Sequence, residues 1–135
     1  MLKITEFLDI DKIAQLRELN GAELDQNDNF SWHIALTDGG RLLGVARMFR
    51  TRDGDFYIDR PYLYSDNSAH GEMLTRTLLL KAQTIGGANA VTRGSAEEYA
   101  KYGFKQASGG TLTVAAEDIL FPRSCGGSCT GCGKD

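Results

Sequence analysis

The chain has 135 residues, of which 41% are hydrophobic and 24% charged, and its formal net charge is -3. This composition is ordinary for one soluble globular domain with a core of its own, and the negative charge argues against a broad surface for nucleic acid. No long apolar run marks a signal peptide or a membrane span, so we expect a cytoplasmic protein with neither a membrane nor a nucleic-acid partner.

The first elements are predicted to be a strand and then a helix. Leu2 to Phe7 alternates loosely between apolar and polar residues, as a strand with one buried face does. Asp9 or Asp11 can then cap a helix, because an aspartate side chain accepts hydrogen bonds from the first helical amides. Asn20-Gly21 is expected to end this helix.

A hairpin is predicted next. Trp32 to Thr37 and Arg41 to Phe49 read as its strands, and Asp38-Gly39-Gly40 as its turn. Gly44 in the second strand would let neighbouring backbone pack closely. His33 is a candidate catalytic base, although a single histidine on a strand more often has no catalytic role.

The segment from Phe56 to Tyr64 predicts a further strand, and it contains a proline. Pro61 has no amide to donate, so it either interrupts the hydrogen-bonded ladder or lies at a sheet edge. We therefore expect the strand to leave its neighbour near Arg60-Pro61, or to be an edge strand there.

A long amphipathic helix is predicted from Gly71 to Ile85. Leu74, Leu78, Ala82 and Ile85 recur at the spacing of one helical face, which is expected to pack on the core. Gly86-Gly87 ends the helix, since the residue after a helix often takes a positive φ.

The last part of the domain is predicted to complete a crossover and a sheet. Ala88 to Thr92 reads as a short buried strand, and Ala96 to Tyr102 as a second helix closed by Gly103. Lys105 to Gly110 is a polar turn before a final strand from Thr111 to Ala115. A strand, a helix and a second strand of one sheet form a right-handed crossover.

The start of the long helix predicts an anion site. The first amides of a helix have no internal partners and carry the positive end of the helix dipole, so phosphate binds there readily. The expected donors are the amides of Gly71 to Thr75, and His70 can add a ring N–H.

Three segments resemble motifs of the GNAT superfamily of N-acetyltransferases. Gly40 to Ala46 resembles the Gly-x-Leu-Val-Gly-x-Ala hairpin of that family. His70 to Thr75 occupies the place of the family's Arg/Gln-x-x-Gly-x-Gly/Ala turn, which holds the pyrophosphate of acetyl-CoA, with Met73 and Thr75 at the two glycine positions. Glu98 to Phe104 resembles the family's aromatic-Tyr-Glu-Lys-x-Gly-Phe motif.

The resemblance implies a fold and an activity. The fold would be of the α/β (α+β) class, with a mixed, mostly antiparallel twisted sheet flanked by helices over residues 1–121. The activity would be the acetyl-CoA-dependent transfer of an acetyl group directly to a small amine or a protein amine. The oligomeric state is left open, with a homodimer as one alternative.

The resemblance also assigns roles to individual residues. Tyr99 falls on the family's general-acid tyrosine, and backbone amides near Tyr62 to Tyr64 would polarise the acyl carbonyl as charge develops on it. The base would be Asp59, His33 or a chain of water molecules. The residues implied in cofactor binding are Tyr62, Leu63, Tyr64, His70, Gly71, Glu72, Met73, Leu74 and Thr75.

A glycine-rich tail, residues 122–135, contains all three cysteines, Cys125, Cys129 and Cys132. Without a secretory signal a stable disulfide is not expected, and the glycines allow the three thiolates to converge on a zinc ion or an Fe–S cluster. Both centres usually need four protein ligands, so a fourth ligand would come from elsewhere. A flexible reactive tail without metal is the alternative.

Two other functions remain open on the sequence. The first is a degenerate GNAT fold that has lost acyl-CoA binding and serves as a binding or sensory module. The second is a small metal-carrying or redox adaptor that acts through the cysteine tail. A rise of the melting temperature with acetyl-CoA would favour the enzyme over the first, and bound zinc or iron would support the second.

Overall fold

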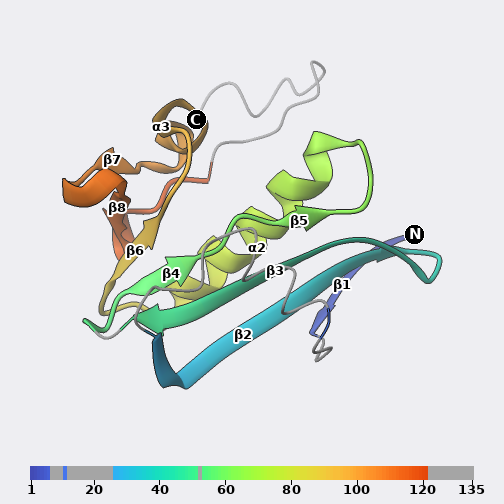
Figure 1. Ribbon diagram of the computed structural model, residues 1–135, viewed down its shortest axis with the longest axis horizontal. Helices are drawn as coiled ribbons and strands as arrows, with labels where there is room; N and C mark the ends of the chain where they lie inside the picture. The colour runs from blue at the N-terminus through green and yellow to red at the C-terminus, as the bar shows by residue number, and fades with distance from the viewer. Residues whose placement is uncertain (7–10, 12–25, 52, 122–135) are drawn as a thin grey trace.

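A computed structural model describes residues 1–6, 11, 26–51 and 53–121 of the chain. Within these ranges the strands form one sheet in the order β1-β2-β3-β4-β6-β8-β7, with β5 also paired to β3 (Figure 1). Among the strands of the described residues, the pairing of β4 with β6 alone is parallel, so the predicted mixed, mostly antiparallel sheet is confirmed. The strands are β1 (Leu2–Glu6), β2 (Gln26–Asp38), β3 (Arg41–Thr51), β4 (Phe56–Ile58), β5 (Tyr62–Leu63), β6 (Asn89–Thr92), β7 (Lys105–Gln106) and β8 (Leu112–Ala115).

β2 and β3 form the predicted long hairpin. Gly44 of β3 leaves room for the side chains of Leu63 and Leu74 to pack on it. A Cβ atom at Gly44 would lie 2.8 Å from Leu63 Cδ2 and 3.0 Å from Leu74 Cδ1. The first distance is shorter than real Cβ contacts and the second is tight, so a side chain at residue 44 would force the ends of Leu63 and Leu74 to shift.

The predicted strand from Phe56 to Tyr64 is in fact two short strands. β4 pairs with β3 at Met48 to Arg50, whereas β5 pairs with β3 further along, at Gly44 and Val45. Pro61 lies in the break between β4 and β5. The expected departure of the strand near the proline is therefore confirmed.

The long helix α2 (Ser68–Ile85) runs along one face of the sheet (Figure 1). Leu74, Leu78, Leu79 and Ala82 are completely buried in one hydrophobic cluster with apolar residues of the strands. The face predicted to pack on the core does so except at Ile85, the last residue of the helix, which is 42% exposed.

The predicted start of α2 at Gly71 is wrong. The helix begins at Ser68, because Asn67 has an extended conformation and its side chain accepts a hydrogen bond of 2.9 Å from the amide of Ala69. The C-terminal end at Gly86 agrees with the prediction, and Gly86 has a φ of 69°.

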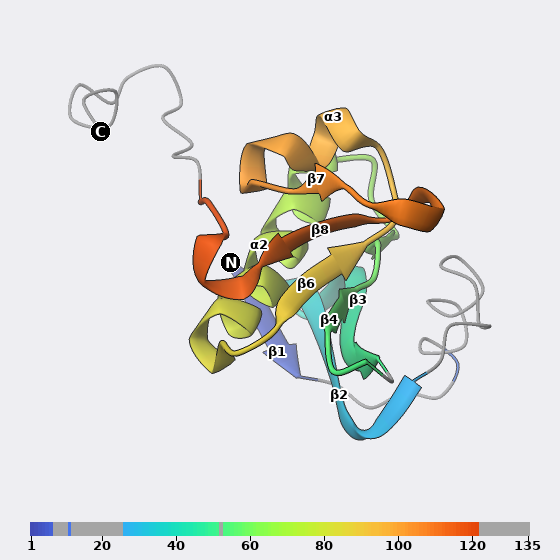
Figure 2. The same ribbon diagram turned by 90° about the vertical axis from the view of Figure 1, so that its left-hand side faces the viewer.

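The crossover and the elements after it follow the predicted order. β6 lies parallel to β4, and Ser95 caps the helix α3 (Ala96–Tyr99), which continues as the 3-10 helix η1 (Ala100–Tyr102). Gly103 closes η1 with a φ of 93°. The predicted polar turn contains the short strand β7 and the 3-10 helix η2 (Ser108–Gly110), and the 3-10 helix η3 (Ala116–Asp118) follows β8. In Figure 2, α3, β7 and β8 lie toward one end of the molecule and β1 and β2 toward the other.

Two predicted features involve residues that the structure does not describe. The helix expected after Asp9 or Asp11 and the cysteine tail lie outside the described residues, apart from Asp11 itself. None of the helices in the described part combines the length and the apolar character that crossing a membrane requires.

Candidate active site

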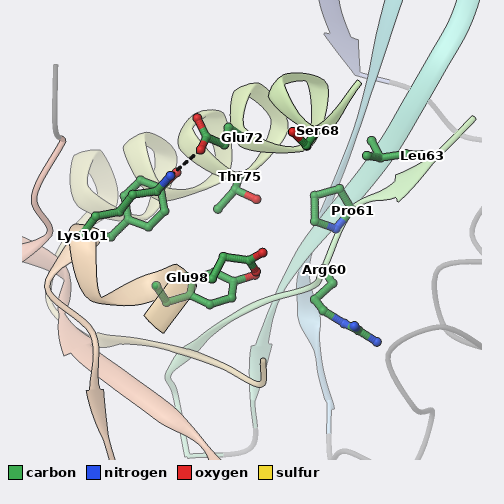
Figure 3. Close-up of a pocket in the computed structure, with 11 residues that line it drawn as sticks. Arg60, Pro61, Leu63, Ser68, Glu72, Thr75, Glu98 and Lys101 are labelled. Carbon is green, nitrogen blue, oxygen red and sulfur yellow. Dashed lines mark hydrogen bonds and ion pairs between the residues drawn. The ribbon is translucent and has the colours of Figure 1, made fainter. Parts of the chain in front are cut away.

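A cavity of about 420 Å³ opens between β5, the first turns of α2, and the short helices α3 and η1 (Figure 3). Its volume is in the range of small-molecule and cofactor sites. Its wall combines apolar, hydroxyl and charged side chains, with two cations and two carboxylates. The lining residues are Arg60, Pro61, Leu63, Ser68, Gly71, Glu72, Thr75, Glu98, Tyr99, Lys101 and Tyr102.

The cavity exists because two neighbouring strands diverge. β4 and β6 pair at only two positions, the second of which joins Tyr57 and Val91. At the end of this short ladder, Thr92 Oγ1 donates a hydrogen bond of 2.6 Å to the carbonyl of Ile58. Beyond this point β5 follows β3 while β6 leads into α3, so a wedge-shaped space opens between them.

The ring of Tyr99 forms part of the cavity wall and is only 3% exposed. It packs edge-on against Phe104, with the ring centroids 5.5 Å apart. Gly94 leaves room for it, since a Cβ atom there would lie 2.9 Å from Tyr99 Cε2. Burial raises the pKa of Tyr99 to about 12, against the lowering effect of a hydrogen bond with the Thr92 side chain. The phenol is therefore protonated at neutral pH.

In β5, the backbone N–H and C=O of Leu63 are directed toward the cavity. The amide of Tyr64 donates to the carbonyl of Leu43 across 2.8 Å, so it is engaged with β3 and does not face the cavity. Successive residues of a strand direct their peptide groups to opposite edges, so those of Leu63 point away from β3. No strand of the described residues pairs with that edge, and Leu63 lines the cavity.

The start of α2 places different amides at the cavity from those predicted. Because the helix begins at Ser68, the amides from Glu72 to Thr75 lie inside it and bond to carbonyls of the preceding turn. The amide of His70 donates to the carbonyl of Asn67 across 3.0 Å. The first helical residue, Ser68, lines the cavity, so the dipole end of α2 lies one turn earlier than predicted.

The side chain of Met73, which stands at a glycine position of the GNAT motif, does not fill the cavity. It lines a different groove, on another side of α2, together with Ile4 and Phe121. Thr75, at the second glycine position, is 6% exposed and lines the cavity. Leu74 is completely buried in the core.

The ring of His70 has a partner in the loop that precedes α2. Its Nδ1 atom shares a hydrogen bond of 2.7 Å with Ser65 Oγ, and the ring is not among the cavity-lining groups. The predicted role of His70 as an additional donor to an anion therefore has no support from its position.

Asp59 forms a buried ion pair on the other face of the sheet. Ile58 points into the core on the α2 side, so the next side chain, Asp59, points to the opposite face. Arg47 Nε donates to Asp59 Oδ2 across 2.5 Å, and both side chains are buried. Asp59 Oδ1 has no hydrogen-bond partner within the described part of the chain. Burial raises the pKa of Asp59 to about 6, although Arg47 opposes this.

His33, the alternative base, lies in β2 directly opposite Arg47 in β3. Burial, and to a smaller extent the charge of Arg47, lowers the pKa of His33. The imidazole is therefore neutral at physiological pH, but it does not line the cavity.

An ion pair connects two walls of the cavity. Lys101 Nζ of η1 donates to Glu72 Oε2 of α2, as the dashed line in Figure 3 shows. The Lys101 side chain is 37% exposed and the Glu72 side chain 57%, so water reaches the pair.

The structure brings together about half of the predicted site. The predicted residues that line the cavity are Leu63, Gly71, Glu72, Thr75 and Tyr99, and those that do not are Asp59, Tyr62, Tyr64, His70, Met73 and Leu74. The prediction gave no role to Arg60, Pro61, Ser68, Glu98, Lys101 and Tyr102, which also line it. Lys101 carried a signal that was available, because it stands at the lysine of the Tyr-x-Lys-x-Gly-Phe pattern.

The predicted metal ligands Cys125, Cys129 and Cys132 lie outside the described residues. Within the described part of the chain, no group of three or more His, Cys, Asp or Glu side chains is placed to hold a metal ion. The zinc or Fe–S site thus stays a prediction from the sequence.

Comparison with solved structures decides the fold. An acyl-CoA N-acyltransferase from Pseudomonas aeruginosa aligns with a TM-score of 0.65 and 18% identity, over 85% of this chain and 100% of that chain. The chain has the GNAT acetyltransferase fold. A GNAT family acetyltransferase from Brucella melitensis, in complex with acetyl-CoA, aligns with a TM-score of 0.64 and 15% identity, over 85% of this chain and 88% of that one. A GNAT family N-acetyltransferase from Escherichia coli, in complex with CoA, aligns with a TM-score of 0.60 and 16% identity, over 85% and 81%.

The GNAT likeness is one of structure and not of overall sequence. No protein-family model matches the chain. A sequence search of curated proteins gives no match either. The GNAT fold predicted from the three motifs is confirmed. The chemistry depends on the side chains of the cavity.

Proposed function

We propose that this protein is an acetyl-CoA-dependent N-acetyltransferase that transfers the acetyl group directly to a small amine or a protein amine. The observation that carries the proposal is the cavity itself, which combines the unpaired edge of Leu63, the start of α2 and the Tyr99 phenol. The solved GNAT structures with bound CoA or acetyl-CoA support the same ligand class.

The residues at the cavity fit an extended thioester ligand. A Cβ atom at Gly71 would contact Leu63 Cδ1 at 3.4 Å, so the glycine keeps a narrow space open between α2 and β5. Ser68 lies at the first turn of α2, where the positive end of the helix dipole favours phosphate. The thioether of Met73 points elsewhere and leaves the space open.

The N–H of Leu63, which pairs with no strand of the described residues, is the group that would stabilise the oxyanion. As the amine attacks the thioester, negative charge develops on the carbonyl oxygen, and a fixed backbone donor in a partly dry site stabilises that charge most effectively. Gly44 contributes indirectly, because its lack of a side chain leaves room for Leu63 to lie close to β3.

Tyr99 would act on the leaving sulfur. A pKa of about 12 lies well above the value of about 8.5 that is ordinary for a thiol. The phenol thus stabilises the departing thiolate by donating a hydrogen bond, and a full proton transfer to sulfur would run uphill. The phenol lies beside Thr92, at the point where β4 and β6 separate.

We propose Asp59 as the base, acting through a chain of water molecules, because its side chain points to the face of the sheet opposite α2 and does not line the cavity. A carboxyl group with a pKa of about 6 is mostly ionised at neutral pH while still being a useful base. In the reaction the C–N bond forms as the C–S bond breaks. The amine loses one proton to Asp59, and the thiolate gains one from solvent.

A transfer assay tests the proposal. The purified protein is mixed with acetyl-CoA and a panel of primary amines, and both free CoA thiol and acetylated amine are measured. The proposal predicts equal amounts of the two products with at least one amine class. Thiol release without acetylated amine would reveal only hydrolysis, and the absence of both with small amines, peptides and whole-protein acceptors would refute the proposal.

A further inference from the structure

The ion pair between Glu72 and Lys101 links two different elements that line the cavity. The two residues come from different walls of the cavity, α2 and η1, and are separated by 29 residues in the chain. Figure 3 shows the pair at one side of the cavity, with Thr75 pointing into the space beneath it. The pair therefore joins the two walls between which an extended ligand would lie.

Lys101 is the cation of the cavity that lies beside α2. Figure 3 shows Arg60, the other lining cation, directed away from Lys101 at the opposite side. The pKa of Lys101 is raised, chiefly by its hydrogen bond with Glu72, so the ammonium group stays charged throughout the neutral range. The Lys101 ammonium group contacts Glu72, which lies one helical turn after Ser68 in α2. This permanent cation is therefore well placed for a second anionic group of a ligand that begins at the start of α2.

The pair is also weak enough to be exchanged. Exposed ion pairs contribute little to stability, because water screens them and two flexible side chains must be held in place. A phosphate group carries more charge and more acceptor oxygens than a carboxylate, so it competes well for the same ammonium group.

We propose that Lys101 binds a phosphate group of the acyl donor's nucleotide part, and that Glu72 competes with this phosphate for Lys101. The inference rests on the proposed function and adds a determinant of donor specificity. A donor with phosphate groups replaces the Glu72 carboxylate on Lys101, whereas a thioester without phosphate leaves the ion pair in place and binds independently of it.

The test compares donors with and without phosphate by isothermal titration calorimetry of the full chain. Acetyl-CoA, its 3′-dephospho form and acetyl-pantetheine are titrated into wild type, Lys101→Met and Glu72→Gln. Lys105→Met is the matched control, because Lys105 is an exposed lysine of β7 outside the cavity. Thermal unfolding checks that each variant is folded.

The expected effects have opposite signs for the two variants. Lys101→Met should weaken acetyl-CoA binding about 10-fold or more, as the loss of a charged hydrogen bond does. Glu72→Gln should strengthen it about 2- to 5-fold, the equivalent of an exposed ion pair. Acetyl-pantetheine should bind all four proteins within about 2-fold of one another, because it has no phosphate to compete. The 3′-dephospho form shows which phosphate Lys101 contacts.

The outcomes separate this inference from the proposed function. If Lys101→Met binds acetyl-CoA as wild type does, or loses affinity equally for acetyl-pantetheine, the inference is overturned and the proposed function stands. If no donor binds to wild type or to Glu72→Gln, both are overturned.

Discussion

Arg47 Nε and Asp59 Oδ2 lie 2.5 Å apart between β3 and the end of β4, with both side chains shielded from water. The amide of Asp59 also donates to the carbonyl of Arg47 across 3.0 Å, so the backbone of the two residues is fixed together. A charge that is buried in this way is stable only while its partner is present. The pair therefore fixes the residue that precedes the break between β4 and β5.

Arg47→Met should destabilise the protein in a pH-dependent way. The pKa of Asp59 is about 6 in the folded protein against an ordinary 3.8, so its contribution to stability is present below about 3.8 and is lost as the pH rises through 6. Without Arg47 the folded pKa rises further. We expect the free energy of unfolding at pH 8 to fall by about 3–5 kcal/mol, and by clearly less at pH 5.

Urea unfolding at the two pH values measures this effect. The double variant Arg47→Met with Asp59→Leu serves as the control, since it removes both charges and should recover most of the loss at pH 8. An equal loss at pH 5 and pH 8, or no recovery in the double variant, would contradict the role of the buried charge.

The ionisation of Asp59 should also determine how kcat/KM falls at acidic pH. With an aniline acceptor, whose amine is already neutral near pH 6, kcat/KM should rise about tenfold per pH unit below pH 6 and level off above it. Asp59→Asn should lower kcat/KM by about 10²- to 10⁴-fold and remove the limb. A limb that persists in Asp59→Asn would assign the base to another group, such as His33.

Tyr99→Phe should slow the chemical step without abolishing donor binding. The variant keeps the ring that packs on Phe104 and loses only the hydroxyl, so the loss of a donor to the leaving sulfur should lower kcat by about 10²-fold. Tyr64→Phe is the control, because Tyr64 is 40% exposed and lies outside the cavity. If both variants retain wild-type kcat, the leaving group is stabilised in another way.

Two glycine substitutions should have opposite effects on stability. Gly44→Ala places a methyl group 2.8 Å from Leu63 Cδ2, and overpacking of this kind costs about 1–3 kcal/mol. Gly71→Ala meets Leu63 only at 3.4 Å and replaces a glycine inside a helix, which should add about 0.5–1 kcal/mol. Chemical denaturation measures both. A neutral Gly44→Ala would show that β5 is not held against β3 as described.

The elements that the sequence predicts well are those with a local signal. The apolar spacing of Leu74, Leu78 and Ala82 and the stop at Gly86 locate α2, and Pro61 marks the break before β5. The start of α2 also has a local signal, because Asn67 is a strong capping residue. The alignment with the GNAT motif instead predicts a start at Gly71, four residues later.

The contacts that define the site have no local signal. Arg47 and Asp59 meet through the register of β3 and β4, and Lys101 meets Glu72 across the cavity. The peptide directions of β5 also follow from its register with β3, so sequence alone could not tell that Leu63, and not Tyr64, faces the open edge. Pairings of this kind are settled by tertiary structure, and residue types indicate only that charged partners are required.

The proposed function requires that the cavity beside Leu63 and Tyr99 binds the acyl donor. The most direct measurement is the ¹H–¹⁵N NMR spectrum of the labelled protein as acetyl-CoA is added. The account predicts saturable shifts of the amides of Leu63, Ser68 and Gly71, with Lys105 of β7 unchanged. A spectrum that does not change, or shifts confined to residues away from this cavity, would contradict it.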